Sequence, residues 1–276
     1  MITIDSTDGV RLAVHELGTP DPDARPLLLC HATGFHGRVW RALADELPGR
    51  RCLALDFRGY GDSTEPEGEL TWDGFGRDIL AVVDALDLAP VQAVGHSKGG
   101  AAILLAEQER PGTIDRAVCF EPILFPPMEG TPGPNHLAEI TKKRREVFDS
   151  FDDAIANFAS KPPLGTLRPD VLDDYVRHGF VQQADGSVRL KARREHEAKT
   201  YETGSAHGGF ARLGDVACPV LVAHGGDADG PALIAPLVAD ALPHGELRAF
   251  PELGHFGPLE DPARFATLVA EFLGAS

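Results

Sequence analysis

Short apolar runs alternate with segments whose apolar residues recur at helical spacing, towards both ends of the chain. This alternation is typical of a mostly parallel sheet that is covered by helices on both faces. The apolar runs predict eight strands, near residues 2–5, 11–16, 26–30, 51–56, 91–95, 116–121, 219–224 and 246–250. The helical spacing predicts helices over residues 39–47, 74–87, 98–109, 232–241 and 262–273.

The middle of the chain breaks this alternation. It opens with the Pro- and Gly-rich stretch FPPMEGTPGPN and continues through charged amphipathic segments. Four of these segments predict helical pieces, namely HLAEITKKRREVFDSF, FDDAIANFAS, RPDVLDDYVRHGF and KARREHEAKTYETG, and QADGSVRL predicts a turn or short hairpin. We therefore expect a core domain of residues 1–123 and 213–276, with a helical cap inserted at 124–212 over one edge of the sheet.

The composition limits the classes of partner. A chain of 276 residues, 43% of them hydrophobic, can bury a full-sized core. Its formal net charge of -16 argues against nucleic acids and anionic membranes as partners, because both are negatively charged. The densest basic run, KKRR at residues 142–145, is flanked by Glu139 and Glu146, and we expect it on a solvated helix face.

The cysteines and the absence of long apolar runs bear on location. No run approaches about 18 apolar residues, and the first residues alternate like a strand instead of forming a basic and then apolar leader. The four cysteines lie in or beside separate apolar runs, without C-x-x-C spacing, at Cys30, Cys52, Cys119 and Cys218. They predict core residues in a reducing compartment. We expect a soluble cytoplasmic protein, a monomer or homodimer.

The stretch GHSKG, residues 95–99, has the pattern G-x-S-x-G between a predicted strand and a predicted helix. Glycines on either side of Ser97 allow a turn tight enough to raise the serine above the sheet, facing the positive end of the helix. A hydroxyl is a poor nucleophile at neutral pH and needs a base that a third group orients. His255, on a glycine-flanked loop between the last predicted strand and helix, is the histidine best placed to be that base.

With these motifs the chain resembles an α/β-hydrolase-fold enzyme. The resemblance includes HATGF (residues 31–35) after the third strand and DFRGYGDS (residues 56–63) after the fourth. It implies an α/β-hydrolase fold and an oxyanion hole formed by the backbone N–H groups of Thr33 and Lys98. Ala32 replaces the glycine that is usual in the first motif. DFRGYGDS is interpreted as scaffold, with its glycines turning the loop and its charges pinning it.

The acid that orients His255 is left open between two residues. The resemblance usually places it after the seventh strand, in HGGDADG, where Asp227 and Asp229 both lie and Asp229 fits the common spacing better. A minority of the family uses a carboxylate at the end of the sixth strand, where this chain has Glu121. A glutamate that ends an apolar strand is costly to bury unless it is paired. Either choice keeps the chain order serine, acid, histidine.

The side chain of Lys98 has three candidate roles, since the position after the nucleophile often borders the pocket in this fold. It could bind a substrate carboxylate or enolate, assist the oxyanion, or pair with Glu121 or another acid. The aromatic residues beside the motifs are candidate pocket walls, namely Phe35, Trp40, Phe125 and Phe256.

Together these features predict a serine hydrolase without metal or cofactor that cleaves a small ester or lactone through an acyl-enzyme. An aspartate nucleophile would be needed for dehalogenase or epoxide hydrolase chemistry, which Ser97 therefore disfavours. Carbon–carbon bond hydrolysis, lyase chemistry and perhydrolysis use the same triad and stay open, as does a non-catalytic receptor for a small molecule.

Overall fold

The computed structural model describes residues 1–21, 23–127, 135–228 and 230–274. Over these residues eight strands form one sheet, in the order β1-β2-β4-β3-β5-β6-β10-β11. The strands are β1 (Ile2–Asp5), β2 (Arg11–Leu17), β3 (Pro26–Cys30), β4 (Arg51–Asp56), β5 (Val91–His96), β6 (Ile114–Phe120), β10 (Val220–Gly225) and β11 (Gly245–Phe250). β2 pairs antiparallel with β1 and β4, and the other neighbouring pairs are parallel. The eight predicted strands and the mostly parallel sheet are confirmed.

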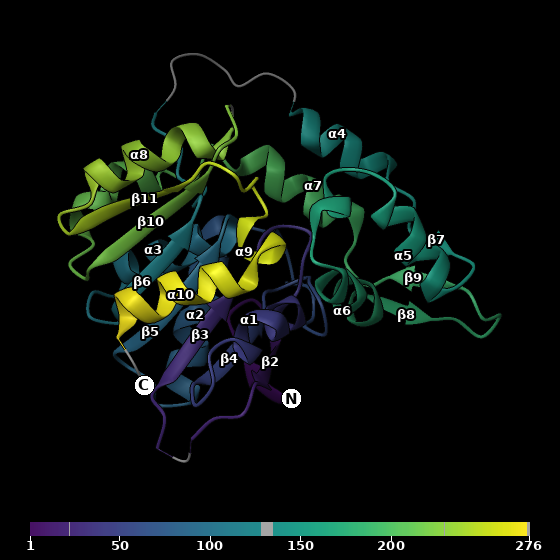
Figure 1. The fold of residues 1–276 in the computed structure, drawn as a ribbon, viewed down its shortest axis with the longest axis horizontal. Coiled ribbons are helices and arrows are strands. Elements are labelled where there is room, and N and C mark those ends of the chain that lie inside the picture. The colour runs from purple at the N-terminus through teal and green to yellow at the C-terminus, as the bar shows by residue number, and fades with distance from the viewer. Residues whose placement is uncertain (22, 128–134, 229, 275–276) are drawn as a thin grey trace.

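Helices flank this sheet on both sides (Figure 1). α2 (Trp72–Ala85) packs against α3 (Lys98–Glu109), α1 (Arg41–Asp45) packs against α10 (Pro262–Leu273), and α8 (Pro231–Ala241) packs on β10 and β11. The helices that were predicted here are confirmed, except that the first begins as a 3-10 turn, Gly37–Trp40. No helix in the described part of the chain has both the length and the apolar character needed to cross a membrane.

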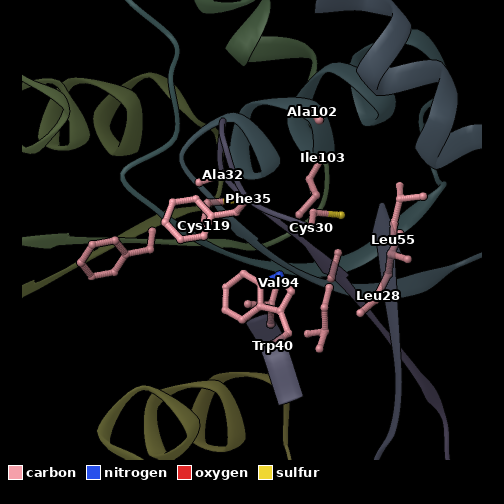
Figure 2. Close-up of a cluster of buried hydrophobic side chains, with 14 of the residues drawn as sticks. Leu28, Cys30, Ala32, Phe35, Trp40, Leu55, Val94, Ala102, Ile103 and Cys119 are labelled. Carbon is pink, nitrogen blue, oxygen red and sulfur yellow. The ribbon is translucent and has the colours of Figure 1, made fainter. Parts of the chain in front are cut away.

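The core lies between the sheet and these helices, and Figure 2 shows a part of it. The residues of β3 from Leu27 to Cys30 are fully buried, as expected for a central parallel strand covered on both faces. They pack with apolar side chains from β4, β5 and α3, among them Leu55, Val94 and Ile103. All four cysteines are buried with free thiols, which confirms that they are core residues.

Between β6 and β10 the chain forms a separate group of elements, at the right of Figure 1. It contains α4 (His136–Lys143), α5 (Phe151–Ala159), α6 (Pro169–Gly179) and α7 (Arg194–Thr203). Three short strands, β7 (Val147–Phe148), β8 (Phe180–Gln182) and β9 (Val188–Leu190), pair antiparallel in the order β7-β9-β8. The predicted hairpin in QADGSVRL is confirmed, since β8 and β9 flank its turn.

One predicted helical piece of this segment is wrong over half its length. HLAEITKKRREVFDSF is helical only as far as Lys143; Arg144 is extended, with φ -61° and ψ 139°, and β7 follows. Consecutive cations repel one another, and the extended backbone brings the guanidinium of Arg144 to Glu197 on α7. The expectation of a solvated helix face for KKRR is therefore wrong for Arg144, whose side chain is only 21% exposed.

Candidate active site

Ser97 occupies a strained turn between β5 and α3. Its backbone has φ 55° and ψ -113°, in the region that favours glycine, and the residue is almost fully buried. A Cβ on Gly95 would lie 2.5 Å from the backbone nitrogen of Gly100, and a Cβ on Gly99 would lie 2.0 Å from the carbonyl oxygen of Cys30. Only glycine fits at these two positions, so the pattern G-x-S-x-G is what allows the turn to close against β3.

Glu121 follows β6 directly and also has a left-handed backbone, with φ 46°. Its side chain is fully buried. Oε1 accepts a hydrogen bond of 2.8 Å from the backbone N–H of Gly225, and Oε2 lies 2.5 Å from Nδ1 of His255. Non-glycine residues held in this region are costly and cluster at functional sites. Two of the four in the described chain are Ser97 and Glu121.

His255 lies between β11 and α9 (Gly257–Glu260), and three contacts fix it. Its backbone N–H donates to Oδ2 of Asp227 at 3.0 Å, and its carbonyl oxygen accepts from Nε2 of His96 at 2.7 Å. Nδ1 donates to the carboxylate of Glu121, which leaves the lone pair of Nε2 available to take a proton. This is the arrangement that a histidine base requires.

These contacts distinguish the candidate acids. Glu121 contacts the ring of His255, whereas Asp227 holds its backbone. Asp229, which fitted the common spacing, lies outside the described residues. Of the described carboxylates that the sequence singled out, Glu121 is the one placed to orient the imidazole.

His96 is a part of the site that the sequence reasoning missed. It is fully buried, and its ring ties the strand that carries Ser97 to the loop that carries His255. Burial lowers the pKa of His96 well below its usual range, and the nearby His255 lowers it further, so the imidazole is neutral and Nε2 donates. The only signal in the sequence was a histidine at the first variable position of the G-x-S-x-G motif, directly before Ser97.

The loop after β3 is pinned by His31. Its Nδ1 donates to the carbonyl oxygen of Ala32 at 2.7 Å, while Nε2 accepts the backbone N–H of Phe57 at 3.1 Å. Burial holds the pKa of His31 well below its usual range, which keeps this donor and acceptor pair intact. Thr33 follows on this loop, and Lys98 is the first residue of α3, where backbone N–H groups have no partner within the helix.

The side chain of Lys98 lies among three aromatic rings. It is fully buried, with Nζ 3.8 Å from the ring centroid of Tyr60, 4.4 Å from that of Phe57 and 4.5 Å from that of Phe75. Burial lowers its pKa well below the usual range, although nearby acids such as Asp78 oppose the shift. The ammonium has no hydrogen-bond partner among the described residues, so pairing with Glu121 or another acid is wrong.

A pocket of about 580 Å³ opens beside the site. Thr33, Gly34, Phe35 and Phe256 form its side nearest the motifs, and residues from the segment between β6 and β10 form the rest. Phe35 and Phe256 thus lie where a pocket wall was expected. Trp40 and Phe125 do not line this pocket, and Trp40 is a fully buried core residue.

DFRGYGDS forms a scaffold, as predicted. Oδ1 of Asp56 accepts the N–H of Gly37 at 2.6 Å, and Oδ2 accepts the N–H of Asp62 at 2.8 Å and lies 2.9 Å from Nε2 of His15. Among the described residues, His15, Asp56 and Asp62 are also the group whose ligand atoms lie close enough together to hold a metal ion. Bonds within the protein already engage the carboxylate of Asp56, which makes this cluster a structural one.

Comparisons with known proteins by sequence and by structure agree on the family of this chain. A sequence model described as "Alpha/beta hydrolase family" matches residues 27–268. The chain is 28% identical to a non-heme chloroperoxidase of Streptomyces lividans, over 92% of this chain and 96% of that protein. It is 27% identical to 2-hydroxymuconate semialdehyde hydrolase of Pseudomonas sp. strain CF600, over 96% of this chain and 91% of that one. The crystal structure of E-2-(acetamidomethylene)succinate hydrolase has a similar fold, with a TM-score of 0.78, 21% identity and 99% and 98% of the two chains covered.

Proposed function

The chain belongs to the alpha/beta hydrolase family, and we propose that it is a serine hydrolase that cleaves a carboxylic ester or lactone of a small organic substrate. One observation carries the proposal. A fully buried glutamate holds Nδ1 of a histidine whose backbone is tied to the residue before Ser97, so that Nε2 is the free ring nitrogen. A carboxylate, an imidazole and a strained serine together are the parts of an activated nucleophile.

In the first half of the proposed reaction, Oγ of Ser97 attacks the substrate carbonyl while Nε2 of His255 takes the hydroxyl proton. Glu121 holds the imidazole in the required tautomer and stabilises its positive charge. The carbonyl oxygen becomes an oxyanion, which accepts hydrogen bonds from the backbone N–H groups of Thr33 and Lys98. The tetrahedral intermediate collapses when His255 returns the proton to the leaving alcohol, and an acyl-enzyme remains.

In the second half, water donates a proton to Nε2 of His255 and attacks the acyl carbon. The same two N–H groups stabilise the second oxyanion. Collapse releases the carboxylic acid and returns the proton to Oγ of Ser97. These steps use only groups of the protein, the substrate and water. The segment at residues 124–212 would act as the cap that roofs the pocket and selects the substrate.

Perhydrolysis is the second candidate, and the 28% identity to a non-heme chloroperoxidase favours it. In this reaction hydrogen peroxide replaces water in the attack on the acyl-enzyme, and the product is a peracid. Adding peroxide to a reaction with acetate and measuring bromide oxidation separates it from simple hydrolysis, because a peracid oxidises bromide and a carboxylic acid does not. Ser97→Ala protein should lose both activities.

The proposal is tested by intact-mass measurement after incubation with a fluorophosphonate, followed by peptide mapping. We expect one adduct per chain on Ser97, and none in Ser97→Ala protein. The absence of an adduct on folded wild-type protein would refute an activated serine. Turnover of p-nitrophenyl acetate then measures the hydrolysis itself.

A further inference from the structure

The pocket lies beside the loop of Thr33 and Gly34, called the oxyanion loop below, and its charge is opposite to that of the whole molecule. The chain has a formal net charge of -16. Yet the charged residues that line the pocket, within the described chain, are one carboxylate, Glu197, and four cations, namely Lys143, Arg144, Arg145 and Lys161. Three of these cations come from the basic run at residues 142–145 that was expected on a solvated helix face.

Arg144 and Glu197 neutralise each other inside the pocket. Nη1 of Arg144 donates to Oε1 at 3.0 Å and Nη2 donates to Oε2 at 2.6 Å. Burial opposes the charge of Arg144, but the carboxylate of Glu197 outweighs it and raises the pKa of the guanidinium above its usual value. A Cβ on Gly34 would lie 2.8 Å from Oε1 of Glu197, so the pair sits against the oxyanion loop. Arg144 thus balances the negative charge of Glu197 beside that loop.

The remaining cations leave a surplus of positive charge. Arg145 pairs with Asp153, with 3.3 Å between Nη2 and Oδ2. Nζ of Lys161 donates to the uncharged amide oxygen of Asn157 at 3.2 Å. Neither Lys161 nor Lys143 forms an ion pair with a carboxylate of the described residues. Two ammonium groups at the pocket are therefore not balanced by acids.

Much of the wall between these charges is apolar. Phe148, Phe158, Leu164 and Tyr175 line the pocket together with Phe35 and Phe256. A ligand that complements this lining would have an apolar stem, with its carbonyl at the side of Thr33 and Gly34 and an anion at the lysines.

We propose that the substrate of this site carries a negatively charged group of the carboxylate class, separated by an apolar stem from the scissile carbonyl, and that Lys143 and Lys161 select it. This inference rests on the proposed esterase function and narrows it to one substrate class. Lys143 and Lys161 are exposed residues that line the pocket of an acidic protein. Cations so placed attract and orient such a ligand, and ionic strength weakens the attraction.

The kinetic test compares two esters with the same leaving group and a similar stem, the p-nitrophenyl monoester of adipate and p-nitrophenyl hexanoate. We expect a higher kcat/KM for the adipate ester, with an advantage that falls as salt is raised. Lys143→Met and Lys161→Met should each reduce the ratio of the two kcat/KM values about two- to fivefold, the range for an exposed ion pair, chiefly through a lower kcat/KM for the adipate ester.

Lys142→Met is the matched control. Lys142 precedes Lys143 on α4 and carries the same charge, but it pairs with Glu139 and Glu202, at 3.0 and 2.7 Å, and does not line the pocket. Its substitution should leave the ratio unchanged. A ratio that falls equally in Lys142→Met and Lys143→Met would show an effect of net charge alone and overturn the proposal.

A binding test makes the result independent of catalysis. Calorimetry of Ser97→Ala protein measures its affinity for adipate and for hexanoate, the two acids that these esters would release. Tighter binding of adipate, weakened by Lys143→Met but not by Lys142→Met, supports the proposal even if neither ester is hydrolysed. Equal binding of the two acids overturns it, while hexanoate ester turnover and labelling of Ser97 would still support the esterase.

Discussion

Glu121→Gln is the substitution that most directly tests the proposed triad. The amide is nearly isosteric, and its Oε1 can still accept the backbone N–H of Gly225. Its Nε2, however, faces Nδ1 of His255 with donor hydrogens where the carboxylate oxygen now accepts at 2.5 Å. Nδ1 must then accept, which places the ring proton on Nε2. An imidazole protonated at Nε2 cannot take the proton of Ser97.

The expected loss is large because Glu121 is fully buried and water cannot substitute for it. The wrong tautomer costs about 10⁴ in kcat in a serine protease triad, and we expect about 10³–10⁴ here, or about 4–5.5 kcal/mol. The assay is p-nitrophenyl acetate turnover, together with the rate of fluorophosphonate labelling. Thermal unfolding of the same samples confirms that the variant is folded.

Asp227→Asn is the matched control for this prediction. Its amide oxygen can still accept the backbone N–H of His255, which the carboxylate now holds at 3.0 Å, so we expect less than a tenfold loss. A larger loss in Asp227→Asn than in Glu121→Gln would refute the assignment of the acid, as would a Glu121→Gln enzyme within tenfold of wild type.

Two further substitutions test the packing around Ser97, the proposed nucleophile. Folding lowers the pKa of Lys98, so the unfolded chain binds more protons than the folded one between the lowered pKa and about 10.4, and wild-type stability rises with pH across that window. At pH 7 the Lys98→Met protein should be more stable than wild type, by about 1.4 kcal/mol for each unit by which the pKa is lowered within the range above pH 7. Denaturant titrations should show that this gain shrinks towards pH 10. A difference in stability that stays constant with pH would contradict the reasoning. Gly99→Ala would place a Cβ 2.0 Å from the carbonyl oxygen of Cys30 and should abolish labelling of Ser97 or unfold the chain, whereas Gly214→Ala, with no atom within 4 Å of its Cβ, should match wild type in both.

The sequence predicted the parts of the fold and site that depend on local pattern. The central strands are continuous apolar runs because they are buried on both faces, and such runs are visible without any knowledge of their neighbours. The turn that carries Ser97, the proposed nucleophile, was visible for a similar reason. Gly95 and Gly99 are required by close backbone approaches within and beside the turn itself.

The remaining features depend on partners that are distant in the sequence. α4 ends before Arg144, whose guanidinium binds Glu197, 53 residues later in the chain. The pattern of α4 alone therefore suggested a longer helix. Lys98 was expected near the reacting groups because it follows the nucleophile, but its side chain fills a space between the rings of Phe57, Tyr60 and Phe75. The apolar spacing of a helix does not show which loops will pack against each of its faces, so the contacts of Lys98 were not visible in the sequence.

The hydrogen bond from His96 to the carbonyl oxygen of His255 ties the end of β5, which precedes the proposed nucleophile Ser97, to the loop of the proposed base. A displacement of the end of β5 moves Ser97 and His255 together, so thermal motion of this strand changes the distance between them little. Because burial keeps the imidazole of His96 neutral, this tether does not titrate in the pH range where a catalytic histidine gains and loses its proton. The relative position of Ser97 and His255 is therefore independent of the protonation cycle of His255 in the proposed mechanism.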